Sequence, residues 1–283
     1  MFTISASAAS FIGCGDVNAA LEKASEARQL SADLAVQFTK ATDAANRAVM
    51  ADTDETSVTF AHEAEQATGA VQKDADALAP MLQSLNYADE SRLLADFAGK
   101  FKEYRALDRS ILDLAVENTN LKAQRLSFGP AQESADMFRD ALKTVTPSAG
   151  TDTWHVAALV AQAQTTMREI QVLQSPHIAN ADEAVMTRME KEMATSEMTA
   201  RHALEALRPL VAPASRPALA AATAAFNRFM ELNTQIIGLS RRNSNVRSLA
   251  LSLDQKRTII AACDTSLHAL QSALAKRGYT GTR

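Results

Sequence analysis

The sequence predicts an all-α protein, an elongated antiparallel helical bundle of two stacked four-helix modules built from a duplicated long-helix hairpin. Three observations lead to this prediction. Nearly half of the 283 residues are hydrophobic, whereas Gly and Pro are few, a composition typical of helical proteins. Apolar residues recur at helical spacing over long tracts. One long segment also returns later in the chain without a gap.

The repeat relates residues 101–127 to residues 226–252, 125 positions further along. An ungapped repeat of this kind indicates that two halves of the chain occupy similar surroundings. Several of the pairs that differ are mild exchanges, such as Lys122/Arg247 and Asp108/Asn233. The identical pairs include Phe101/Phe226, Leu107/Leu232, Ile111/Ile236, Leu114/Leu239, Asn118/Asn243, Asn120/Asn245, Leu126/Leu251 and Ser127/Ser252.

Four long helical tracts account for most of the chain. The first, at about residues 16–78, has a weak point at residues 51–56 (ADTDET). The others cover about residues 89–145, 152–207 and 215–277. Turns that contain Pro, Gly or Asn separate the tracts, because these residues favour turns over continued helix.

Two further breaks are predicted inside the tracts, at Gly129–Pro130 in the second and at Pro176 in the third. Both lie roughly 20–25 residues from the turn before Asp152, the expected N-cap of the third tract. They therefore fall at nearly the same height on adjacent antiparallel helices, which predicts two stacked modules with the first and fourth helices running through both. Tracts of about sixty residues would make a rod about 90 Å long, with both termini at one end.

The charge and cysteine content exclude several classes of protein. The formal net charge is -4 and no polybasic block is present, which argues against general nucleic-acid binding. Cys14 and Cys263 form no Cys-x-x-Cys pair, so a zinc ribbon, a thioredoxin-like site and c-type haem attachment lack their ligands. Cys263 is expected to be a small core residue. No apolar run reaches the ~20 residues that span a bilayer.

A heptad seam in the second and fourth tracts places an asparagine in line with core leucines in each copy of the repeat. Two hypotheses remain open: a core Asn fixes the register between helices, or the amides recognise a ligand. The second and fourth tracts are expected to run parallel in an up-down-up-down bundle, so Asn118 and Asn243 should lie at similar height across the core. The two seams are Leu107, Ile111, Leu114, Asn118, Leu121, Arg125 and Phe128, and Leu232, Ile236, Leu239, Asn243, Val246, Ala250 and Leu253.

Basic residues follow both asparagines, with Arg241 and Arg242 close by. Amides combined with ammonium or guanidinium groups suit a small carboxylate or another oxyanion. The candidate ligand-binding residues are therefore Asn118, Lys122, Arg125, Asn243 and Arg247.

A secondary candidate set comprises Trp154, His155, Arg168 and Arg257, with His177 and Cys263 in the same predicted module. Trp154 either packs against the core or lines a pocket, and core packing is the preferred interpretation. A stripe of methionines could be interpreted as a copper site, because thioether ligands suit soft metals. The spacing of these methionines along the helix instead favours a stripe of core residues. The stripe is Met186, Met189, Met193 and Met198, near His202.

No catalytic motif is present: the chain lacks a phosphate-binding glycine loop, a nucleophile elbow and a metalloprotease helix. A di-iron bundle is disfavoured because no Glu-x-x-His pair occurs. The sequence therefore predicts a protein that is not an enzyme and that needs no metal and no cofactor.

Three stretches resemble the periplasmic region of bacterial methyl-accepting chemotaxis receptors: LAVENTNLKAQRLSFGPA, REIQVLQSPHIANADEAVM and LSRRNSNVRSLALSLDQKR. The broken tracts are similar to those of the helical bimodular sensor domain. The resemblance implies a periplasmic ligand-binding domain of an inner-membrane protein, excised from between two membrane helices and acting as a homodimer. Relatives bind small organic acids. No binding residue of the family can be matched to a position in this chain.

We therefore expect an input domain that binds a small organic anion and signals by helix displacement. Alternatives are a sensor histidine kinase input domain, a structural or protein-interaction rod without a small ligand, and, less favoured, a metal- or cofactor-binding bundle. The predicted boundaries are an N-terminal flank (1–15) and a helical sensor domain (16–283), with a membrane-proximal module (about 16–48, 131–175 and 256–278) and a distal module (about 49–128 and 180–255).

Overall fold

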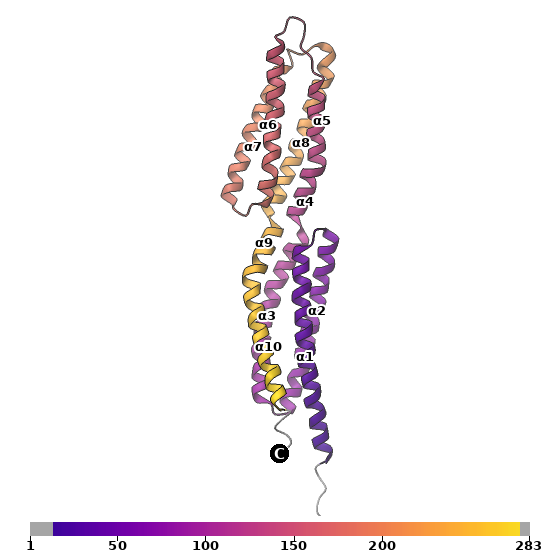
Figure 1. Ribbon diagram of the computed structural model, residues 1–283, viewed down its shortest axis with the longest axis vertical. Helices are drawn as coiled ribbons and strands as arrows, with labels where there is room; N and C mark the ends of the chain where they lie inside the picture. The colour runs from indigo at the N-terminus through magenta and orange to yellow at the C-terminus, as the bar shows by residue number, and fades with distance from the viewer. Residues whose placement is uncertain (1–13, 278–283) are drawn as a thin grey trace, which may run out of the picture. The chain divides into compact units, whose positions relative to one another are not determined.

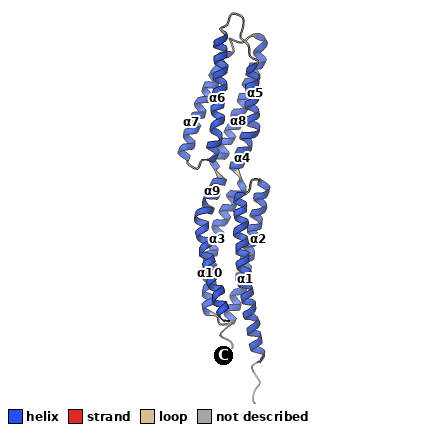
Figure 2. Cartoon of the chain, viewed as in Figure 1, coloured by secondary structure: helices blue, strands red, loops and turns tan. Residues whose placement is uncertain are grey.

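The computed structural model describes residues 14–277, which contain no β-strand. Helices account for almost all of this range (Figure 2), and only an isolated bridge joins Pro147 to Val211. The predicted all-α class is therefore confirmed. The predicted N-terminal flank, residues 1–15, lies almost wholly outside the described residues.

The chain forms two compact units, and unit 1 contains residues 14–51, 55–113 and 251–277 of the described range (Figure 1). Its four helices share one core. Phe38 of the first helix contacts the rings of Phe97, Phe101 and Tyr104, with centroids 5.2–6.1 Å apart. The elements are α1 (Cys14–Met50), α2 (Asp54–Ser84), most of α3 (Ala88–Glu117), a π-helical turn (Ser252–Lys256) and α10 (Arg257–Arg277).

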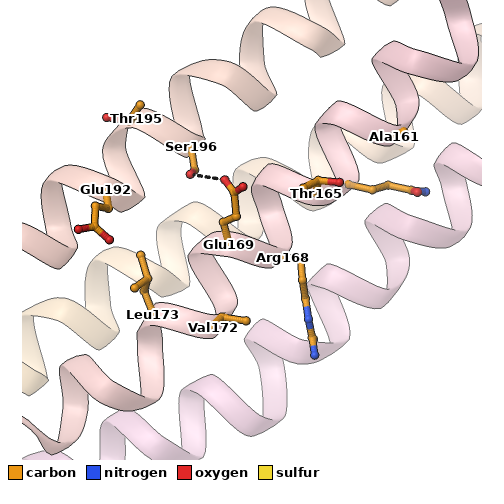
Figure 3. A pocket seen from close by; sticks show the side chains of 10 residues that line it. Ala161, Thr165, Arg168, Glu169, Val172, Leu173, Glu192, Thr195 and Ser196 are labelled. Atoms are coloured by element: carbon orange, nitrogen blue, oxygen red, sulfur yellow. Dashed lines mark hydrogen bonds between the residues drawn. The ribbon is translucent and has the colours of Figure 1, made fainter.

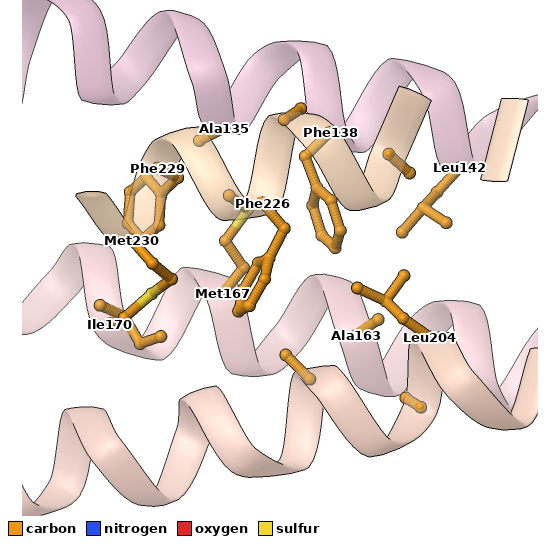
Figure 4. Packing of buried hydrophobic residues seen from close by; sticks show 14 of the residues in the cluster. Ala135, Phe138, Leu142, Ala163, Met167, Ile170, Leu204, Phe226, Phe229 and Met230 are labelled. Atoms are coloured by element: carbon orange, nitrogen blue, oxygen red, sulfur yellow. The ribbon is translucent and has the colours of Figure 1, made fainter. Parts of the chain in front are cut away.

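Unit 2 contains residues 52–54 and 114–250 and has a separate core (Figure 4). In that core Phe138 packs against Phe226, with ring centroids 5.6 Å apart. Asp152 caps α6 through the Trp154 amide, as predicted, and Asp182 caps α7. The elements are α4 (Thr119–Leu126), a π-helical turn (Ser127–Ala131), α5 (Gln132–Lys143), α6 (Thr153–Ala179), α7 (Glu183–Leu207), a 3-10 turn (Pro213–Ser215), α8 (Arg216–Arg242) and α9 (Ser244–Leu251).

The tracts that pass from one unit to the other are the second and the fourth, so the prediction that the first and fourth do so was wrong. The first tract instead reverses at residues 51–53, and the third reverses at residues 180–182. Residues 131–175 consequently belong to unit 2, not to a module with residues 16–48. The chain does not reverse at Gly129–Pro130, because a π-helical turn carries the helix past this pair.

The two units have the same arrangement of helices and equivalent buried positions. Residues 125 positions apart in α3 and α8 are buried alike, as in Phe101/Phe226 and Ile111/Ile236. The hairpin of α1 and α2 corresponds in the same way to the hairpin of α6 and α7, with Phe38 matching Met167. The final helix of each copy packs in the opposite unit: α5 belongs to unit 2 and α10 to unit 1. The repeat seen in the sequence is therefore a duplication with exchanged closing helices.

The predicted heptad seam holds only up to the asparagines. Ile111 and Ile236 are buried, but Phe128 is 69% exposed and Leu253 is 62% exposed. The interruption of the helix at Asn118 or Asn243, followed by a π-helical turn, changes the helical phase, so a heptad register continued past it points to solvent. The core stripe of Met186, Met189 and Met193 is confirmed, as is burial of Cys263, whereas Met198 is exposed.

Candidate functional site

Asn118 and Asn243 each interrupt a long helix. Asn118, between α3 and α4, has φ 50° and ψ 38°, and Asn243, between α8 and α9, has φ 55° and ψ 37°. This left-handed conformation is disfavoured for most residues and tolerated by asparagine. Both side chains are buried. The sequence repeat therefore conserves a backbone conformation as well as a polar residue.

The residues after the two breaks bond to each other reciprocally. The Thr119 amide donates to Ser244 Oγ at 3.1 Å, and the Ser244 amide donates to Thr119 Oγ1 at 3.0 Å. The amides of Asn120 and Asn245 likewise donate to the partner's Oδ1, both at 3.1 Å. The first turns of α4 and α9, whose N–H groups lack partners within the helix, thus satisfy each other.

The asparagine side chains complete this network. Asn245 Nδ2 donates to Asn118 Oδ1 at 2.9 Å, and Asn120 Nδ2 donates to Asn243 Oδ1 at 2.8 Å. Asn243 Nδ2 donates to the Asn180 carbonyl at 2.7 Å, while Asn118 Nδ2 is buried without a hydrogen bond among the described residues. Asn118 is therefore bonded to Asn245, and its repeat equivalent Asn243 is bonded to Asn120. These side-chain amides serve mainly to join the two helix breaks.

The expectation that the second and fourth tracts run parallel was wrong. Phe138 packs on Phe226, and Thr146 bonds Ser215 at 2.8 Å, so residue numbers rise along one tract as they fall along the other. The reason is the reversal at residues 180–182, which divides the third tract into the α6–α7 hairpin and so reverses the chain once more than the prediction assumed.

Three basic residues surround Glu117, at the end of α3. Arg242 Nε donates to Glu117 Oε2 at 2.7 Å, and Lys122 Nζ donates to the Glu117 carbonyl at 2.8 Å. The hydrogen bonds from Arg242, with the charges of Arg242, Arg247 and Lys122, hold the pKa of the Glu117 carboxyl below its usual range. One carboxylate thus faces three cations, a local excess of positive charge beside the asparagine network.

Arg125 lies outside this arrangement. It is exposed and pairs with Asp54 at 3.1 Å, because the helical phase has changed by this point of α4. The structure therefore brings together Asn118 and Asn243 and places Lys122 and Arg247 near Glu117.

The secondary candidates do not form one site. Trp154 is 84% exposed, so the expectation of core packing was wrong: the residue sits in the first turn of α6, beside the capping Asp152, where the chain reverses. His155 is exposed as well. Arg168 lines a groove of about 800 Å³ between α6 and α7 (Figure 3), whereas Arg257 belongs to unit 1.

The groove between α6 and α7 is mainly apolar, with Val172 and Leu173 on its surface (Figure 3). Glu169 accepts a hydrogen bond from Ser196 Oγ across the groove at 2.8 Å, and Arg168 points the opposite way. Arg168 therefore does not face Glu169, and the groove also contains a second carboxylate, Glu192.

A buried polar network in unit 2 was missed by the sequence analysis. His177 is fully buried; its Nδ1 lies 2.8 Å from Ser240 Oγ and its Nε2 lies 2.8 Å from Glu190 Oε1. Arg241 holds both oxygens of Glu190, at 2.6 and 2.9 Å. These contacts cross α6, α7 and α8, so their residues are separated in sequence and carry no common spacing that a pattern search would detect.

The described part of the chain contains no cluster of three or more His, Cys, Asp or Glu side chains arranged to hold a metal ion. None of the helices within residues 14–277 combines the length and the apolar character needed to cross a membrane. The sequence matches no protein-family model and no curated protein.

Proposed function

We propose that the chain is the ligand-binding input domain of a membrane receptor, sensing a small carboxylate-type anion outside the cytoplasm and signalling by helix displacement. The proposal draws on the resemblance to periplasmic chemoreceptor regions and on one structural observation that carries it. Two long helices are both broken at buried asparagines, and the breaks are joined to each other next to an excess of positive charge.

The joined breaks offer a mechanism for transmission. The hydrogen bonds between the starts of α4 and α9 fix how the two long tracts lie against each other at this point. An anion that bound Lys122 and Arg247 would weaken their attraction to Glu117 and favour a different offset of the tracts. A ligand shifts such an equilibrium only by its differential affinity for the two arrangements.

The ends of unit 1 also suit an input domain. α1 and α10 run antiparallel, since Ser252 bonds Asn46 and Gln271 bonds the Ser31 carbonyl. The start of α1 and the end of α10 therefore lie at the same end of this unit, where two membrane segments would have to join it. A chemoreceptor and a sensor histidine kinase would use this geometry equally, each as a homodimer.

The test is a calorimetric and thermal-shift screen of the purified chain with small organic acids. A ligand present at 100 times its dissociation constant should stabilise the fold by about 2.7 kcal/mol. Lys122→Ala and Arg247→Ala should each weaken binding about tenfold, as expected for loss of a charge-assisted contact. The matched control is Arg228→Ala in α8, which removes an exposed arginine that pairs with Glu231.

A chain that no organic acid stabilises would contradict this function and favour the alternative, a structural or protein-interaction module. That alternative has one specific observation in its favour: most of the polar atoms of Asn118 and Asn243 are already bonded within the protein.

A further inference from the structure

Unit 1 contains a buried ion pair that unit 2 lacks. Lys256 Nζ lies 2.6 Å from Asp108 Oδ1, and the two side chains are 0% and 4% exposed. The ammonium also lies 5.6 Å from the centre of the Tyr104 ring. Lys256 closes the π-helical turn before α10, and such turns occur frequently at functional sites. A buried ion pair adds little stability over apolar packing, so its presence calls for another reason.

The Asp108 carboxylate also lines a cavity of about 390 Å³ between α2 and α3. Lys256 pairs with Oδ1, and the Tyr104 hydroxyl interacts with the same carboxylate. The ion pair itself leaves Oδ2 open. Thr68 Oγ1, on the α2 side, is buried without a hydrogen-bond partner among the described residues. Buried polar atoms normally find partners in protein or solvent. The cavity therefore offers a carboxylate oxygen and a hydroxyl to whatever enters it.

The α3 wall of the cavity is cationic. Lys102, Arg105 and Arg109 line it, and Glu65 of α2 stands opposite. Arg105 donates to Gln72 Oε1 at 2.9 Å, but within residues 14–277 none of these three cations lies in an ion pair. A wall that carries one sign of charge raises the local concentration of oppositely charged solutes.

The second copy of the design serves as an internal control. The positions equivalent to Lys102, Arg105, Asp108 and Arg109 hold uncharged residues in α8, and the position equivalent to Lys256 holds Ala131. Unit 2 nevertheless builds the same four-helix core. The fold does not require the charges, so they are a specialisation of unit 1. The α8 residues are Asn227, Met230, Asn233 and Thr234.

We propose that this cavity binds a small zwitterion, an α-amino acid, with its ammonium on Asp108 Oδ2 and its carboxylate on Arg105 and Arg109. A simple anion would meet the Asp108 carboxylate, and a simple cation would meet three positive side chains. A zwitterion offers an ammonium to Asp108 and a carboxylate to the arginines on the same helix, and guanidinium groups match a carboxylate bidentately. The volume accommodates a small molecule of this kind. This site lies in unit 1 and does not depend on the anion site proposed near Glu117.

The experiment is titration calorimetry of the whole chain with the common amino acids, each compared with its analogue lacking the amino group, such as alanine with propionate and aspartate with succinate. At least one amino acid should bind at least about tenfold more tightly than its deaminated analogue. Equal affinity for both, or binding of none, would overturn the proposal.

Two sets of variants locate the site. Arg105→Gln combined with Arg109→Gln changes exposed side chains and should weaken binding at least about tenfold without unfolding the protein. Arg92→Gln, on the same helix and paired with Asp89, is the control and should leave affinity unchanged. Unaltered binding in the double variant would overturn the assignment, whatever the outcome for Arg247→Ala at the other site.

The ammonium contact needs its own variant. Asp108→Asn alone leaves Lys256 buried and unpaired, so the variant to use is Asp108→Asn with Lys256→Ala, which reproduces the residues of unit 2. It should remove the preference for the amino acid over its deaminated analogue. A preference that survives in this folded variant would show that Asp108 does not receive the ammonium.

Discussion

The backbone amide of Asn120 donates to Asn245 Oδ1, and the backbone amide of Asn245 donates to Asn120 Oδ1, both at 3.1 Å. This exchange joins two helix starts whose N–H groups have no partner within their own helices. Asn120 and Asn245 occupy equivalent positions in the two copies of the repeat. An asparagine at this one position therefore provides a hydrogen-bond acceptor for the first turn of α4 and for the first turn of α9. Joining the breaks is thus the role that the structure assigns to these asparagines.

Replacing Asn120 with Ala should lower the free energy of unfolding by about 2–3 kcal/mol, because buried donors and acceptors lose their partners. Asn245→Ala should act similarly, and the double variant should deviate from additivity by at least about 0.5 kcal/mol. Urea denaturation measures all three. Asn18→Ala, at an exposed position of α1, should change stability by less than about 0.5 kcal/mol. Strict additivity would contradict the reciprocal bonding.

Asn118 should tolerate Gly better than Ala. Both variants lose the bond from Asn245 Nδ2, but only Ala carries the strain of the left-handed backbone, so Asn118→Gly should be more stable than Asn118→Ala by about 1–2 kcal/mol. At Gln124, an exposed position within α4, the order should reverse, because Gly is about 1 kcal/mol worse than Ala inside a helix. The same order at both positions would argue against the left-handed conformation.

Lys256→Ala should destabilise the protein by about 3–5 kcal/mol, because Asp108 is left buried without its counter-ion. Burial raises the pKa of the Asp108 carboxyl, and Lys256 opposes that effect, so removing the lysine favours the protonated acid. Adding Asp108→Asn should restore stability to within about 1–2 kcal/mol of the natural protein, as in other replaced buried ion pairs. Chemical denaturation at neutral pH decides this, and a double variant no more stable than Lys256→Ala would refute it.

Acid should weaken unit 2 through Glu190. Hydrogen bonds from Arg241, assisted by His177, lower the pKa of this carboxyl in the folded state. Its contribution to stability is therefore complete above its unfolded pKa, near 4.5, and is lost as the pH falls through the lower folded value. Unfolding free energies between about pH 3 and 7 should depend less on pH in Glu190→Gln. Parallel pH profiles would contradict the role of Glu190.

The Cys263 thiol should resist alkylation in the folded protein. It is fully buried in the core of unit 1, and burial raises its pKa to about 12, which leaves almost no reactive thiolate at neutral pH. Iodoacetamide labelling followed by peptide mass spectrometry should detect modification of Cys263 only after denaturation. Rapid labelling of the native protein at this residue would contradict the described packing.

The asparagines show how far the repeat could be interpreted without coordinates. Their recurrence at equivalent positions correctly marked buried polar residues, because an ungapped repeat implies equivalent surroundings. The heptad register failed beyond them, because it assumes one continuous helical phase, and a left-handed residue together with a π-helical turn changes that phase. Arg125 and Phe128 were consequently assigned to a seam that faces solvent.

The positions at which the chain reverses could not be predicted from the sequence either. Pro176 and the Gly129–Pro130 pair are stronger helix breakers than the ADTDET stretch, yet the chain reverses at residues 51–53 and passes straight through Pro130. Local propensity measures the cost of a helix at one position, about 3 kcal/mol for proline. The burial of a whole apolar face is worth more than that, so tertiary packing decided where the chain turned.

By itself the sequence determined the helical class, the duplication and the burial of Met186, Met189 and Met193, because composition and helical periodicity are local properties that every fold of this chain must respect. Only the tertiary structure decided the exchange of closing helices, the reciprocal asparagine bonds and the pairing of Asp108 with Lys256. Those contacts join residues more than a hundred positions apart, and no local preference specifies which distant partners meet when the apolar faces are buried.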